Sequence, residues 1–209
     1  LIADLGGERV VGWGSDEEPH ANANAHSIAS VLAAGGQFNL GAFARGVRFG
    51  FGSGRGSLSS DQFVPPAGQL DLLDESGAPS PGLAAVRRLC TFASRFERLF
   101  ASLDTGFEAT VATPSHPNAK PKGKRAQPIS VVHKRGSQGS VTFVLGSTKE
   151  PVLLTLADGS QASVATSELG VTWLLEEAHL FARTVLNLST LPVFAQFGKV
   201  LVCFGPSGS

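Results

Sequence analysis

The spacing of apolar residues changes several times along the first part of the chain, which predicts alternating strands and helices. Residues 1–5 form a short apolar run that contains one acid and ends at glycines, as is typical of a buried strand. Residues 24–35 follow helical spacing, begin at an Asn that can cap a helix and end at paired glycines. Residues 37–43 alternate like a second strand. Residues 46–68, rich in Gly, Ser and Pro, are predicted to form a long loop.

A longer amphipathic helix is predicted from Pro81 to about Leu103. Its apolar positions recur at three and four residues, at Val86, Leu89, Cys90, Ala93, Phe96, Phe100 and Leu103. The arginines of this stretch, including Arg88 and Arg95, fall mostly outside that face, so we expect them to be exposed. The order strand, helix, strand, loop, helix is typical of a protein built from βα-repeats.

Helical periodicity largely disappears in the second half of the chain. Residues 109–128 are rich in Pro and Lys and are interpreted as a linker or an exposed excursion. Beyond them, short apolar runs between turn signals predict strands at 129–135, 141–145, 152–156, 161–165, 171–175 and 199–204. Residues 129–209 are therefore predicted to form a small all-β domain.

Composition narrows the range of partners. Lys plus Arg and Asp plus Glu both number 17, so the balanced charge gives no reason to expect nucleic acid or an anionic membrane as partner. No apolar stretch approaches the roughly 20 residues of a membrane span. The 5 histidines never pair at ligand spacing with His or Cys, so no metal site is predicted. Cys90 and Cys203 lie in apolar patterns and are interpreted as buried thiols rather than a disulfide.

Acidic residues gather near the start of the chain, beside an aromatic residue. Asp4, Glu8 and the acids of 16–18 surround Trp13 in the sequence. Two carboxylates must flank a glycosidic bond during its hydrolysis, and an aromatic face can hold the sugar ring, so this pattern suits a glycosidase. The same residues are also compatible with a solvated loop and a core tryptophan. The glycine-rich run 50–56 lacks the Lys-Ser/Thr of a phosphate-binding loop, so it is not interpreted as a phosphate site.

A longer motif resembles a known enzyme family. Residues 29–51, ASVLAAGGQFNLGAFARGVRFGF, are similar to the segment of family 35 glycoside hydrolases that ends NLYMFHGGTNFG. The positions that match it without a gap are Asn39, Leu40, Phe43, Gly46, Phe49 and Gly50. Residues 72–81 resemble the APLDEAG segment of that family, and 12–20 resemble its HWG motif and the Pro-His pair after it. The tail at 198–206 is similar to the closing strand of the β-domain in bacterial members.

The resemblance implies a fold and an activity. Residues 1–108 would be the last strands and helices of a (β/α)8 TIM barrel, followed by the small β-domain, an α/β plus all-β architecture. The whole protein would be a retaining β-galactosidase that hydrolyses terminal β-D-galactosyl residues and needs no cofactor. In such barrels the site lies on the loops after the carboxyl ends of the strands.

The resemblance also assigns roles to residues. The family's nucleophile is a Glu ten residues before the Gly of HWG, and counting back from Gly14 without a gap reaches Asp4. Glu8 is the alternative, because its spacing to Gly12-Trp13 mimics that of the family's acid to its first Gly-Trp. The substrate-binding residues implied are Trp13, Asn39, Phe49 and Asp71. The family's acid/base lies in an Asn-Glu dipeptide, which this chain lacks, so we expect that residue before position 1.

Several departures from the family motif leave other functions open. Gly41 and Ala44 stand where the family has Tyr and His, and the two tyrosines expected near 69–71 are missing. One alternative is a catalytically inactive relative that binds sugar or only folds. Another is an enzyme acting on a different glycoside, and a third treats the β-domain as a carbohydrate-binding or interaction module.

Overall fold

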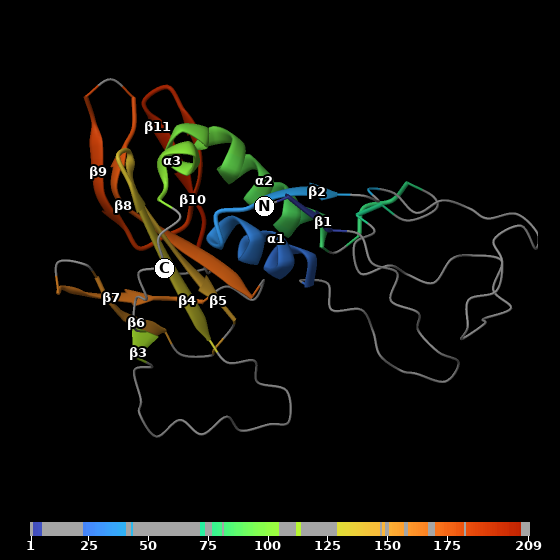
Figure 1. Cartoon of the computed structure of the whole chain (residues 1–209), viewed down its shortest axis with the longest axis horizontal. Coiled ribbons are helices and arrows are strands. Elements are labelled where there is room, and N and C mark those ends of the chain that lie inside the picture. Colours follow the sequence, from blue (N-terminus) through green and yellow to red (C-terminus); the bar gives the residue numbers. More distant parts are fainter. Residues whose placement is uncertain are drawn as a thin grey trace, which may run out of the picture.

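The computed structural model shows a helical layer between a large antiparallel sheet and a small parallel strand pair (Figure 1). The structure describes residues 2–5, 23–40, 43, 72–73, 77–80, 82–104, 112–113, 129–146, 148, 151–156, 159–166, 170–181 and 183–205. Within them, none of the helices has the length and apolar character needed to cross a membrane.

The first part of the chain forms a parallel β–α–β unit. Strand β1 (Ile2–Leu5) pairs in parallel with β2 (Gln37–Leu40), and helix α1 (Ala23–Ala33) lies between them in sequence. The helix ends as predicted at Gly35, whose φ of 75° is a left-handed conformation that glycine adopts without strain. The N–H of Gly36 donates to the carbonyl of Val31 at 2.8 Å, which satisfies a carbonyl at the helix end.

The long helix predicted to begin at Pro81 is two helices. Helix α2 (Leu83–Arg95) and helix α3 (Glu97–Ser102) meet at Phe96, whose φ of −112° and ψ of 32° leave the helical region. The predicted apolar face is buried at Leu89 and Phe96 but only half-buried at Phe100, and Arg95 is exposed as predicted. Arg88 is half-buried rather than exposed, because its guanidinium lies 4.9 Å from the centre of the Phe204 ring in a cation–π contact.

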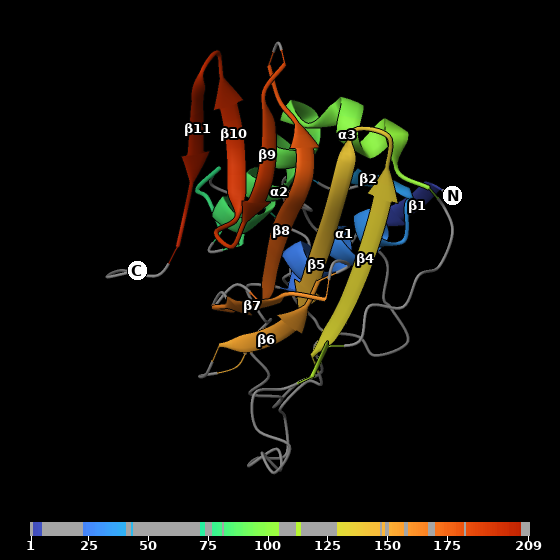
Figure 2. The same ribbon diagram turned by 90° about the vertical axis from the view of Figure 1, so that its left-hand side faces the viewer.

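The antiparallel sheet has the strand order β4-β5-β8-β9. Its strands are β4 (Ser130–Gly136), β5 (Gly139–Leu145), β8 (Val171–His179) and β9 (Val185–Ser189). A hairpin of β10 (Val193–Phe197) and β11 (Val200–Cys203) lies beside β9, and its strand β10 contacts α2 (Figure 2). A small sheet of β3 (Ala112–Thr113), β6 (Val152–Thr155) and β7 (Gln161–Val164) crosses the other end (Figure 2).

Strand β5 and the first five residues of β8 are buried on both faces, which explains why apolar residues predominate there. On the helical side, Phe143 and Trp173 pack against Ile28 of α1 and Phe92 of α2. The rings of Phe92 and Trp173 are stacked with centres 4.7 Å apart, and the Trp173 Nε1–H donates to the carbonyl of Val193 at 2.9 Å. On the opposite side, a second cluster joins the sheet to β6 and β7 through Val144, Val152, Leu154, Leu156, Ala162, Val164 and Leu174.

The predicted fold class, the end of a (β/α)8 barrel followed by a small β-domain, is wrong. A barrel needs parallel strands that each alternate with a helix. The described chain has that alternation only from β1 to β2, whereas α2 runs directly into α3 and the remaining paired strands are antiparallel. The apolar face of α2 packs through Phe92 on Trp173 of the antiparallel sheet. The helical spacing of 81–103 was correct, but spacing alone does not say which surface a helix covers.

Most of the predicted strands occur within one or two residues of their expected bounds, but β8 continues well beyond its predicted end at Leu175. Strands β9 and β10 were missed, because apolar and polar residues do not alternate regularly along their sequences. The division into 1–108, 109–128 and 129–209 stays a prediction.

Candidate functional site

Two of the residues implied by the family resemblance are neighbours in the structure. Asp4 of β1 and Asn39 of β2 are register partners in the parallel pair. Parallel strands end at the same edge, so the segments that follow Leu5 and Leu40 both leave from one side of the pair. In open sheets with parallel strands, ligands bind outside this carboxyl edge.

The residues of β2 divide between two environments. Asn39 and Gln37 are exposed, whereas the alternate residues Phe38 and Leu40 pack against the main apolar cluster. This is the two-residue period of a strand, in which successive side chains point to opposite faces. The polar face of β2 is therefore accessible, and the apolar face holds the strand on α1.

Residues on either side of the predicted loop 46–68 meet close to the carboxyl end of β2. The carbonyl of Phe43 accepts hydrogen bonds from the N–H groups of Leu72 and Leu73, both at 3.1 Å. Leu72 is buried, and together with Leu40 it lines a hollow beside α2. Asp71, which directly precedes Leu72 in the chain, lies outside the described residues, as do Glu8, Trp13 and Phe49.

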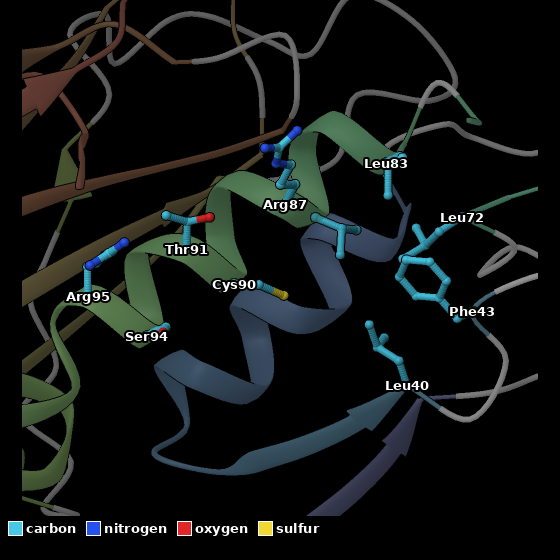
Figure 3. A pocket seen from close by; sticks show the side chains of 10 residues that line it. Leu40, Phe43, Leu72, Leu83, Arg87, Cys90, Thr91, Ser94 and Arg95 are labelled. Carbon is cyan, nitrogen blue, oxygen red and sulfur yellow. The ribbon is translucent and has the colours of Figure 1, made fainter. Parts of the chain in front are cut away.

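A hollow of about 580 Å³ lies between α2 and the end of β2 (Figure 3). Leu40, Phe43 and Leu72 project into it from one side (Figure 3). The opposite wall is the side of α2 that carries Arg87 and Cys90. Among the described residues that line the hollow, none carries a carboxylate, so these residues do not supply the acid pair that glycoside hydrolysis requires. It lies on the apolar side of β2, away from the face that Asn39 occupies.

Both cysteines are free thiols, but neither is fully buried as the sequence predicted. Cys90 is half-buried in the wall of this hollow, and burial raises its pKa. Cys203 is exposed at the end of β11, and partial burial of its sulfur raises its pKa as well. A raised pKa keeps each thiol protonated at neutral pH, so neither is an activated nucleophile.

A buried polar network that the sequence does not reveal spans three neighbouring strands. His133 Nδ1 lies 2.9 Å from Thr142 Oγ1, and this hydroxyl donates to Glu176 Oε2 at 3.4 Å. A hydroxyl that donates its proton to the carboxylate can still accept the ring N–H of the imidazole. His133 is nearly fully buried, and Glu176 has a side chain only 12% exposed. The three residues come from β4, β5 and β8, so only the strand pairing could have revealed the network.

No group of three or more His, Cys, Asp and Glu side chains in the described ranges has the arrangement of a metal site. Comparison with known proteins provides no relative, because no family model and no curated protein sequence matches the chain. The resemblance to family 35 glycoside hydrolases therefore rests on the motif between Asn39 and Phe51 and on the shorter matches around it.

Proposed function

We propose that this chain carries the nucleophile side of a retaining β-galactosidase site, with Asp4 at the nucleophile position and Asn39 beside it. The observation that supports this proposal is the register pairing of Asp4 with Asn39 at the carboxyl edge of the parallel pair. The two residues were assigned to the site from separate motifs, 35 positions apart in the sequence. Their pairing brings the two positions side by side, as a shared sugar-binding site requires.

The chemistry follows from the carboxylate. In a retaining mechanism the Asp4 carboxylate attacks the anomeric carbon, the bond from that carbon to the leaving oxygen breaks, and a second carboxyl group protonates that oxygen. The same second group then takes a proton from the water that attacks the glycosyl-enzyme and releases the sugar. The amide of Asn39 can donate to one sugar hydroxyl and accept from another.

Aspartate is a short residue for this role. It has one methylene fewer than the Glu of the family, which shortens its reach by about 1.5 Å for a single carbon–carbon bond. Retaining enzymes hold their two carboxyls about 5–5.5 Å apart, and a misplacement of about 1 Å can cost a hundredfold in rate. We therefore expect glycosyl transfer to Asp4 to be slow, and Asp4→Glu to accelerate it rather than abolish it.

The present chain alone is expected to turn over no β-galactoside. It has no Asn-Glu dipeptide to supply the acid/base, and general acid catalysis contributes roughly a hundred- to ten-thousand-fold. Labelling is a separate test, because a 2-deoxy-2-fluorogalactoside with a dinitrophenolate leaving group needs little acid assistance. Mass spectrometry of the protein treated with this reagent is expected to find the sugar on Asp4. A label on Glu8 would show that the spacing to Gly12-Trp13 was the correct guide.

The structure offers a matched pair of variants for this experiment. Asn39→Ala should slow labelling of Asp4, whereas Gln37→Ala should not, because Gln37 is exposed on the same strand but pairs with Ile2. Equal labelling of both variants would remove Asn39 from the site.

A sugar-binding relative without catalysis is the second candidate function, and the loss of the family's Tyr and His at Gly41 and Ala44 favours it. If the fluorosugar labels neither the natural chain nor Asp4→Glu, sugar binding without catalysis becomes the preferred function.

A further inference from the structure

Strand β8 carries a β-bulge near its end, at Glu177. Ser140 of β5 pairs with Glu176, yet the N–H of His179 donates to the carbonyl of Gln138 at 2.9 Å. From Glu176 to His179, β8 advances three residues, whereas the opposite segment from Ser140 to Gln138 advances only two. The additional residue in β8 is what defines a bulge. Glu177 has a φ of 50°, and no other non-glycine residue in the described ranges has a positive φ.

The bulge changes which side of the sheet Glu177 faces. Trp173 and Leu175 belong to the helical core at a spacing of two, but the next residue of β8 in that core is Ala178, three positions on. Glu177 is thereby turned to the opposite side, where Arg135 Nη2 donates to its Oε2 at 2.9 Å.

This conformation contributes little to folding. A positive φ is unfavourable for an L-residue with a side chain. The ion pair that it produces is exposed, at 61% for Arg135 and 66% for Glu177, and exposed pairs stabilise proteins weakly. Strained backbone positions of this kind, and bulges that redirect a side chain, are concentrated at functional sites.

Glu177 and Arg135 form part of the wall of a polar pocket of about 350 Å³. Its other side chains are His179 of β8 and Asn187 and Val185 of β9, and the glycine-containing β4–β5 turn completes it. Among the described residues, neither the imidazole of His179 nor the amide of Asn187 has a side-chain hydrogen-bond partner. The pocket lies at the end of the sheet that β6 and β7 do not cover (Figure 2).

The chemistry of this wall selects the kind of ligand. The positive Arg135 is already paired with the negative Glu177, so neither an anion nor a cation gains a net charge partner. A hydroxyl group both donates and accepts, so neighbouring hydroxyls can bind to guanidinium, carboxylate, amide and imidazole together. Val185, 44% exposed, provides an apolar contact for a C–H face. The volume is near the lower end of the roughly 300–1,000 Å³ of ligand pockets, which indicates a small ligand.

We propose that this pocket binds a neutral saccharide unit through Arg135, Glu177, His179 and Asn187. The site is separate from Asp4 and does not depend on the function proposed for that residue. It needs no chemical step, since these four side chains act only as hydrogen-bond donors or acceptors.

Amide chemical shifts of the isotope-labelled chain test the proposal. D-galactose, D-glucose and N-acetyl-D-glucosamine are the saccharide probes, and sodium phosphate at matched ionic strength is the anion probe. At least one sugar is expected to shift the amides of the β4–β5 turn, Glu177 and Asn187. Glu177→Gln and Asn187→Ala should each weaken binding of that sugar about tenfold, because the first removes a charged hydrogen-bond acceptor and the second removes a hydrogen-bonding amide. Glu97→Gln, at an exposed carboxylate of α3, is the matched control and should bind normally.

Glu177→Gly separates binding from folding, because glycine accepts the positive φ. This variant should melt no lower than the natural chain while losing the sugar. The proposal is overturned if phosphate shifts these amides and the sugars do not, if no sugar shifts them, or if Glu97→Gln is weakened equally. If Glu177→Gln does not fold, sugar binding by Asn187→Ala is the deciding measurement, and unchanged binding by that variant overturns the proposal. Asp4→Asn should retain binding in this pocket, so failure of the Asp4 proposal leaves this result unchanged.

Discussion

Replacement of Phe92 by alanine should destabilise the whole described structure, because this ring joins the helical layer to the antiparallel sheet. Phe92 is fully buried and stacks on Trp173, with an angle of 15° between the rings. It also contacts Phe100 and Phe143 at centre-to-centre distances of 5.2 and 6.5 Å. Truncation of a buried Phe to Ala costs about 3–5 kcal/mol. Because the aromatic contacts add about 0.5–1.5 kcal/mol beyond buried area, we expect a value in the upper part of that range.

The assay is denaturant and thermal unfolding, followed by far-ultraviolet circular dichroism and by tryptophan fluorescence. A Trp13→Phe background leaves Trp173 as the sole tryptophan, since the chain has 2. For a chain of this size, about 3–5 kcal/mol corresponds to a loss of roughly 6–20 °C in melting temperature. Ser94→Ala, at an exposed position of the same helix, should change stability by less than ~0.5 kcal/mol.

Two results would refute this reasoning. If Phe92→Ala and Ser94→Ala have equal effects, Phe92 is not in the core. If Phe92→Ala lowers the helical transition but leaves the Trp173 transition unchanged, the helical layer and the sheet unfold independently. Coincident transitions at a lower midpoint are the expected outcome.

Three further predictions concern other parts of the fold. Gly139→Ala should be strongly destabilising in chemical denaturation, because a β-carbon there would lie 2.7 Å from the Cα of Ala178. Gly159→Ala is the control: open space surrounds it, so the variant should cost only the roughly 1–2 kcal/mol of a positive φ. Thr142→Val should reduce the free energy of unfolding by about 1–3 kcal/mol, because it leaves a buried imidazole and carboxylate without their shared hydroxyl; an unchanged midpoint would count against the network. Alkylation by iodoacetamide, followed by mass spectrometry, should modify exposed Cys203 before half-buried Cys90. The reaction should accelerate as pH rises, because both thiol pKa values are raised and the thiolate is the reactive form. Faster alkylation of Cys90 would contradict its placement.

Local signals in the sequence predicted local structure well. The end of α1 followed from Gly35, because only a residue without a side chain adopts its positive φ at little cost. The strand at 141–145 followed from an apolar run too short for a helix and bounded by turn residues. These features depend on a few neighbouring residues, so a single sequence contains the information that determines them.

Features that depend on distant residues could not be predicted in the same way. The break at Phe96 interrupts a stretch whose apolar spacing continues, so periodicity could not reveal it. The surface that α2 covers depends on Trp173, about 80 positions further along the chain. The family resemblance supplied a barrel as the partner of this helix, and the antiparallel pairing of β5 with β8 overturned that inference. The bulge at Glu177 has no signal in the sequence, since an ordinary Glu-Glu pair occupies it.

The candidate site on the β1–β2 pair can be tested without disturbing the fold, because its polar and apolar faces have different roles. Two strands alone have marginal stability, so this pair depends on the packing of Phe38 and Leu40 against the core. Asn39, exposed on the other face, contributes no apolar burial to that packing. Its substitution should therefore affect stability as little as an ordinary surface change, within about 0.5 kcal/mol. A loss of labelling at Asp4 in Asn39→Ala, with unfolding unchanged, would then report on sugar recognition and not on folding.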